Sequence, residues 1–159
     1  MTGPYDLPDR PAITPTGLPA GPDVTQPIEL VPDDNLLVTA AKLLRQRGRC
    51  RERLIDDTGC MCPVGALAVA AGADPDVMLA WENEEADEET PAVYEPVNSL
   101  PETAHLARVI VDSGDENAHY CRSTAPVHTV WYWADRSDDA HVLELLDRAA
   151  DSYQRPAVA

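Results

Sequence analysis

The sequence contains no phenylalanine, few basic residues and no long apolar segment. Without a run of about 18 apolar residues, no transmembrane helix is expected, and the first residues lack the basic and then apolar pattern of a secretory signal. Acidic residues outnumber basic ones by 28 to 12, so the net charge is -16. Direct nucleic-acid binding is not expected, because phosphate recognition requires clustered Lys and Arg. These absences predict a soluble, unexported protein without membrane contact.

Prolines and acidic residues divide the chain into segments. Eight of the 15 prolines lie within residues 1–32, which excludes a helix there and predicts an extended or disordered arm. Residues 33–153 carry the apolar pattern of a single helical domain, and residues 154–159 form a tail. Within that domain, residues 73–107 hold ten acidic residues and no basic one. We therefore expect an exposed acidic loop over about 82–97.

Capping residues and apolar periodicity predict four or five short helices. The run Ala66-Leu67-Ala68-Val69-Ala70-Ala71 has no polar side chain, which is typical of a helix that is buried all round. Pro63 suits the first turn of this helix, and Gly72 suits its end. The same signals predict further helices over about 34–47, 75–81, 99–112 and 137–153.

Two segments between these helices are expected to be extended. The turn-forming Asp56-Asp57-Thr58-Gly59 predicts a small hairpin or irregular ribbon within residues 49–62. The stretch from Val127 to Trp133 is rich in aromatic and branched residues, which indicates a short strand or an apolar connection. The predicted fold is mainly α, a compact bundle of four or five short helices around a buried central helix at about 63–71, with a small β-ribbon and an extended N-terminal arm.

The cysteines raise the question of a metal site. Cys60, Cys62, His119 and Cys121 would together offer four ligands that suit zinc. The Cys-x-Cys and His-x-Cys pairs are each one residue tighter than the usual zinc-finger spacing. We therefore predict no cofactor and no metal, and keep structural zinc as the alternative.

Cys62 also suggests a second kind of chemistry. It precedes Pro63 at a helix start, where the helix dipole and free N–H groups can activate a thiol. A papain-like arrangement would pair it with His128, oriented by Asp135. The alternative is that Cys62 is a small buried residue that allows the central helix to pack, because free cysteine is among the most buried residue types. We favour burial and predict no catalytic residue.

Several short motifs resemble a family of small actinobacterial and actinophage proteins of unknown function, DUF6197. The matching segments are Leu36 to Gly48, Cys62-Pro63-Val64-Gly65-Ala66-Leu67, Trp133-Ala134-Asp135, and Val142-Leu143-Glu144-Leu145-Leu146-Asp147-Arg148-Ala149-Ala150. Ala134 stands where the family usually has Asn, so this position supplies no reacting amide. The resemblance implies a fold and a source, and it implies no activity.

We therefore predict a non-enzymatic phage or actinobacterial accessory protein that acts through protein–protein contacts in the cytoplasm of a bacterial cell or a phage-infected host. One alternative is an acidic DNA mimic that inhibits a nucleic-acid-binding host protein; the other is a cysteine hydrolase using Cys62 and His128. Neither the partner nor the oligomeric state follows from the sequence. The predicted contact residues are one aromatic anchor and the acidic run that follows it: Trp81, Glu82, Glu84, Glu85, Asp87, Glu88 and Glu89.

Overall fold

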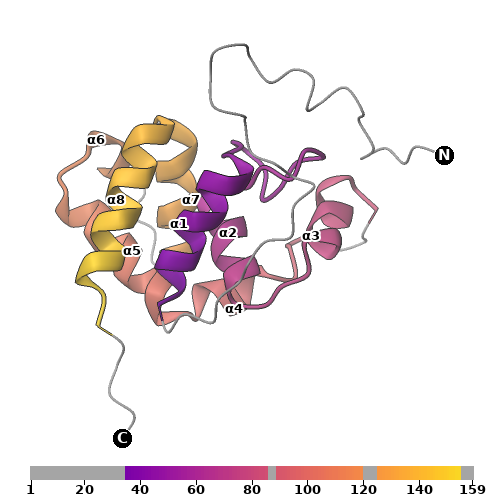
Figure 1. The fold of residues 1–159 in the computed structure, drawn as a ribbon, viewed down its shortest axis with the longest axis horizontal. Helices are drawn as coiled ribbons and strands as arrows, with labels where there is room; N and C mark the ends of the chain where they lie inside the picture. The colour runs from indigo at the N-terminus through magenta and orange to yellow at the C-terminus, as the bar shows by residue number, and fades with distance from the viewer. Residues whose placement is uncertain (1–34, 86–88, 120–124, 155–159) are drawn as a thin grey trace, which may run out of the picture.

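A computed structural model describes residues 35–85, 89–119 and 125–154 (Figure 1), and these residues form eight helices. The predicted arm over 1–32 and nearly all of the predicted tail lie outside the described residues. The mainly helical class is confirmed. The helices are α1 (Leu36–Arg47), α2 (Pro63–Ala70), α3 (Pro75–Glu82), α4 (Tyr94–Asn98), α5 (Pro101–Asp112), α6 (Glu116–His119), α7 (Pro126–Arg136) and α8 (Asp139–Ser152).

Polar side chains begin several helices by accepting hydrogen bonds from otherwise unpaired N–H groups. Asn35 accepts from the Leu37 amide at 3.0 Å and starts α1, and Asp74 starts α3 in the same way. Asp138 caps α8 through the His141 amide at 2.8 Å. Ser137, at the predicted start of this helix, instead donates its hydroxyl to the Trp133 carbonyl at 2.8 Å and closes α7.

Helix α5 also begins differently from the helix predicted over about 99–112, because Ser99 is not its capping residue. Leu100 occupies the cap position and makes no side-chain cap bond. The Ser99 amide donates to the Glu95 carbonyl at 3.0 Å, so this residue ends α4. The sequence patterns did not predict α4 or α6, which have five and four residues, because such short helices carry almost no periodicity.

The stretch after residue 126 is a helix, so the predicted strand or connection there is wrong. Val127, Val130, Trp133 and Ala134 are buried in α7 at helical spacing, whereas Tyr132 is exposed. Three- and four-residue spacing places these side chains on one face of a helix. Tertiary burial of that face outweighs the strand preference of its branched and aromatic residues.

The predicted β-ribbon over 49–62 is also wrong, because no strand occurs among the residues described. Met61 forms one isolated bridge with Arg49 and another with Ile55. Glu52, at a φ of 62°, turns the chain between these two partners. The loop therefore places Arg49 on one side of Met61 and Ile55 on the other, and neither pairing extends beyond one residue.

The helices pack as two connected groups rather than around α2 alone. The main contacts of α2 are with α1, α7 and α4, whereas α5 and α8 pack on each other. Helix α1 lies between α2 and α8 (Figure 1), and α7 joins α2 to α5. The predicted buried helix at 63–71 is buried from Pro63 to Val69, whereas Ala70 is half-buried and Ala71 is exposed. The single-centre arrangement is not supported.

The burial of α2 depends on Gly65. A Cβ atom at this position would lie 2.1 Å from the Leu54 carbonyl oxygen, a separation that no side chain tolerates. The same oxygen accepts a hydrogen bond from the Cys62 amide at 3.1 Å. Glycine is therefore required where the helix meets the preceding loop.

Arg49 connects this loop to the junction of α7 and α8. Its side chain is only 3% exposed, and its guanidinium donates to the carbonyls of Ala134 and Ser137 at 2.7 and 2.6 Å. It also donates to Asp139 at 2.7 Å, but that carboxylate is 69% exposed. The hydrogen bonds to the two carbonyls contribute more to stability than the ion pair does, because they satisfy carbonyl groups at the end of α7 that are shielded from water.

We predict that Arg49→Lys destabilises the fold by about 3 kcal/mol, because an ammonium group cannot reach both carbonyls in the geometry of the guanidinium fork. Asp139→Asn is the matched control and should cost less than about 1 kcal/mol, since it removes only a solvated ion pair. Urea denaturation of both variants measures the difference. Equal losses in the two variants would show that the ion pair is the main contribution.

Candidate functional site

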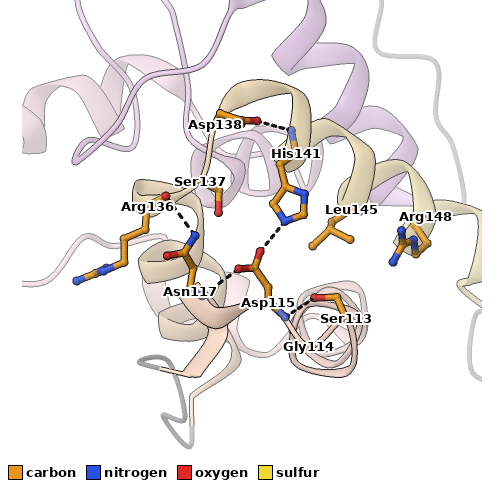
Figure 2. Close-up of a pocket in the computed structure, with 10 residues that line it drawn as sticks. All are labelled: Ser113, Gly114, Asp115, Asn117, Arg136, Ser137, Asp138, His141, Leu145 and Arg148. Carbon is orange, nitrogen blue, oxygen red and sulfur yellow. Dashed lines mark hydrogen bonds and ion pairs between the residues drawn. The ribbon is translucent and has the colours of Figure 1, made fainter.

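A cavity of about 420 Å³ lies where the loop after α5 meets α6 and the start of α8 (Figure 2). Its walls come from two separate chain segments, residues 113–117 and residues 136–148. The lining residues are Ser113, Gly114, Asp115, Asn117, Arg136, Ser137, Asp138, His141, Leu145 and Arg148. We call it the Asp115–His141 pocket.

The carboxylate of Asp115 organises this pocket. One oxygen accepts the Asn117 amide at 2.9 Å. The other accepts Trp133 Nε1 at 3.1 Å and His141 Nε2 at 2.5 Å. Burial opposes ionisation, but these hydrogen bonds outweigh it and lower the pKa of Asp115 below its usual value. Asp115 is therefore ionised at neutral pH.

His141 is held in one orientation with one nitrogen unused. An ionised carboxylate can only accept, so the proton of the neutral imidazole sits on Nε2 and Nδ1 carries a lone pair. The ring packs edge to face on Trp133, with centroids 5.9 Å apart, and the side chain is 35% exposed. No other described residue hydrogen-bonds to Nδ1.

Sequence reasoning missed this site. Neither Asp115 nor His141 is among the residues that the sequence analysis singled out. The two partners are 26 residues apart, so neither spacing nor periodicity links them.

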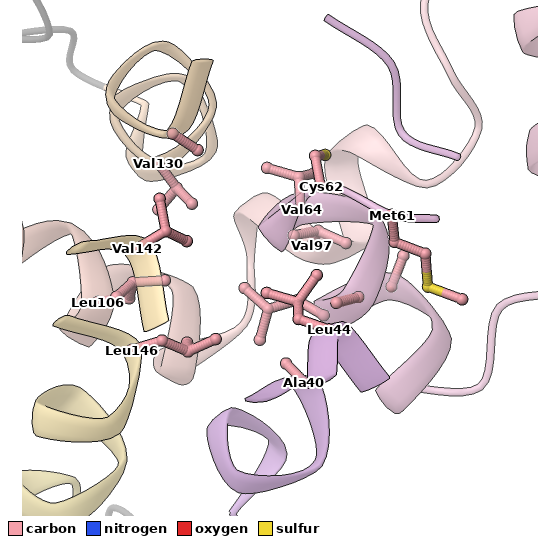
Figure 3. Packing of buried hydrophobic residues seen from close by; sticks show 14 of the residues in the cluster. Ala40, Leu44, Met61, Cys62, Val64, Val97, Leu106, Val130, Val142 and Leu146 are labelled. Carbon is pink, nitrogen blue, oxygen red and sulfur yellow. The ribbon is translucent and has the colours of Figure 1, made fainter. Parts of the chain in front are cut away.

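Cys62 lies in the core among apolar side chains (Figure 3). It is 0% exposed, and its sulfur accepts from the Gly65 amide at 3.4 Å as the cap of α2. Burial raises the pKa of this thiol to about 12. Asp135 accepts the Glu52 amide at 2.9 Å, and His128 pairs with the Tyr94 hydroxyl at 2.9 Å. This geometry disfavours the cysteine-hydrolase alternative.

The zinc alternative is only partly covered by the structure. Cys60 is half-buried, and its sulfur accepts from the Thr58 hydroxyl at 3.0 Å. Cys121 lies outside the described residues, as does the side chain of His119. Within the described part of the chain, no three His, Cys, Asp or Glu side chains are grouped to hold a metal ion. The four-ligand set therefore stays an alternative that the described residues do not test.

The predicted acidic contact segment does not point uniformly outward. Glu82 ends α3 half-buried and accepts the Leu54 amide, and burial raises the pKa of its carboxyl group. Trp81 is also half-buried and packs against the core. The exposed members are Glu84, Glu85 and Glu89, whereas Asp87 and Glu88 lie outside the described residues. The Glu82 carboxylate therefore does not contribute to the exposed acidic surface that a DNA mimic needs.

A row of stacked side chains runs along α7 beside the start of α4. His128 packs edge to face on Tyr94 and on Tyr132, with centroids 5.2 and 6.1 Å apart. The Arg136 guanidinium lies 5.2 Å from the Tyr132 ring centroid, and Tyr132 is 49% exposed. Four-residue spacing places the three α7 members on one helix face. We call Tyr94, His128, Tyr132 and Arg136 the aromatic strip.

We predict that iodoacetamide at neutral pH labels native Cys62 roughly a thousandfold more slowly than a free cysteine, because little thiolate forms and the sulfur is enclosed. Mass spectrometry of the labelled peptide measures the rate, and the urea-unfolded chain is the control. Labelling of the folded protein at the rate of a free thiol would restore the hydrolase alternative.

We also predict that Asp115 contributes to acid sensitivity. Because its folded pKa is lowered, its stabilisation is complete above its unfolded pKa of about 3.9 and is lost as pH falls through the folded value. The stability gap between wild type and Asp115→Asn should therefore narrow between pH of about 5 and about 2. Urea titrations at each pH measure this gap, and a constant gap would contradict it.

Comparison with known proteins identifies the family of this chain and no individual relative. No helix among the described residues has both the length and the apolar content to cross a bilayer. No curated protein and no solved structure matches the chain significantly. A profile described as a family of unknown function, DUF6197, matches residues 29–152 and confirms the resemblance seen in the sequence motifs. The chain therefore belongs to the DUF6197 family.

Proposed function

We propose that this is a non-enzymatic accessory protein that acts by binding another protein, in the cytoplasm of an actinobacterial cell or of a host infected by its phage. The aromatic strip is the observation that supports this proposal most directly. It presents two tyrosines and an arginine on one face of the molecule, and Tyr and Arg are enriched among the residues that dominate binding energy at protein interfaces.

The strip is ordered by contacts of its own. The Tyr94 hydroxyl is 2.9 Å from His128 Nε2, and Arg136 donates to the Tyr132 carbonyl at 2.9 Å while covering its ring. Side chains fixed in this way lose little further freedom when a partner binds. The strip therefore supports binding at a low entropic cost.

Charge favours a basic partner. The chain carries -16 overall, and exposed carboxylates, including Glu89 and Glu95, lie in the segment that leads into and through α4. Glu95 directly follows Tyr94, so acidic and aromatic groups are adjacent at this end of the strip. Complementary charge steers a basic protein towards such a surface and excludes acidic competitors.

Site-specific photo-crosslinking tests the proposal in the full-length chain. A benzophenone amino acid at Tyr132 should capture a defined protein in host cells, whereas the same group at Val111, which is 46% exposed on α5, should not. The captured protein is then purified, and Tyr132→Ala should weaken its binding by roughly 30-fold, the size of an interface hot spot.

Val111→Ala is the matched substitution and should leave the affinity unchanged, and both variants should melt like the wild type because both side chains are exposed. Identical capture from both positions, or normal affinity of Tyr132→Ala, would contradict the proposed contact surface.

A further inference from the structure

The cationic and the hydrogen-bond-accepting groups of the Asp115–His141 pocket differ in whether they already have partners among the described residues. Its two cations are already engaged: Arg148 pairs with Glu144 at 3.0 Å, and Arg136 donates to the Tyr132 carbonyl and covers that ring. Figure 2 shows Arg136 extending away from His141, and Arg148 beyond Leu145. Neither guanidinium is directed at the imidazole.

The acceptors, by contrast, have unused capacity. Nδ1 of His141 carries a lone pair and no partner within the described part of the chain. One oxygen of Asp138 accepts the His141 amide at 2.8 Å, and the structure gives the other oxygen no partner among the described residues. Asp138 is exposed and belongs to the lining of the cavity.

Three helix ends lie at the cavity: the C-terminal ends of α5 and α7, and the start of α8, where Asp138 caps the positive end. Ser113 and Gly114 follow the last turn of α5, and Arg136 and Ser137 end α7. All four residues line the cavity. The C-terminal end of a helix carries partial negative charge and favours cations. The chain as a whole, at -16, also concentrates cations at its surface.

We propose that the Asp115–His141 pocket binds a protonated amine or guanidinium group on a short alkyl chain. The cationic head donates to His141 Nδ1 and to the Asp138 carboxylate, and the alkyl part lies against Leu145, the apolar member of the lining. Asp115 holds the imidazole so that Nδ1 faces the ligand, which makes it a positioning residue. This site is separate from the aromatic strip in its ligand and in its test.

Agmatine is a suitable probe, because it combines a guanidinium, an amine and a four-carbon chain. At a pH of about 8, agmatine should produce a saturable NMR shift of the His141 ring signals in the full-length protein. N-butylurea has a similar shape without charge and should bind at least tenfold more weakly, a difference of about 1.4 kcal/mol.

The variants separate the pocket from general charge attraction. His141→Gln keeps a donor for Asp115 but moves the acceptor from the Nδ1 position to the amide oxygen, so agmatine affinity should fall at least tenfold. Asp138→Asn still caps α8 and should weaken binding to a similar extent. His105→Gln, which changes a histidine bonded to Ser152, is the matched control and should bind normally.

The proposal is overturned by any of three results. These are no saturation up to about 10 mM agmatine, equal binding of N-butylurea, or unchanged affinity in both pocket variants. N-acetylarginine amide identifies the source of the cation, because it binds as well as agmatine only if the pocket accepts a side chain carried on a protein. Failure of the cross-linking at Tyr132 would leave each of these outcomes unaffected.

Discussion

The contact between Gly65 and the Leu54 carbonyl is the constraint on which most of the structure depends. Because no side chain separates them, α2 lies directly against the loop over residues 49–62, and the Leu54 carbonyl accepts the Cys62 amide that starts the helix. The same loop is tied to α3, where Glu82 accepts the Leu54 amide. Through Arg49 it is also tied to the junction of α7 and α8. One close backbone approach thus fixes a loop that contacts α2, α3 and the junction of α7 and α8.

That junction is also where the pocket begins. Arg49 and Arg51 both donate to the Ser137 carbonyl, and the next residue, Asp138, caps α8 and lies beside His141. The loop therefore fixes the position of the pocket wall without contributing a side chain to its lining. Arg49 contacts this wall directly through the Ser137 carbonyl, whereas the small residues of α2 reach it only through the packing of α2 on α7.

The sequence predicts those features whose cause is local. Helices α1 and α8 combine an apolar stripe with a polar cap, and α2 combines a proline start with an unbroken apolar run, so each was found close to its observed bounds. Helix α7 was missed because its branched and aromatic residues favour a strand locally, while burial of Val130 and Trp133 decides the outcome. Glu82 reads as one more acidic residue, and only the tertiary fold provides the Leu54 amide that turns it inward.

The pocket illustrates the limit of local reasoning most clearly. Asp115 reads as a turn residue and does cap Asn117, but its second oxygen is used by Trp133 and His141, which come from two other helices. Arg136 then links the pocket to the aromatic strip: its carbonyl accepts Asn117 Nδ2 at 3.3 Å, and its guanidinium covers Tyr132. The last turn of α7 is therefore a wall shared by both sites. Each proposed site uses a different group of Arg136, the pocket its carbonyl through Asn117 and the strip its guanidinium over Tyr132.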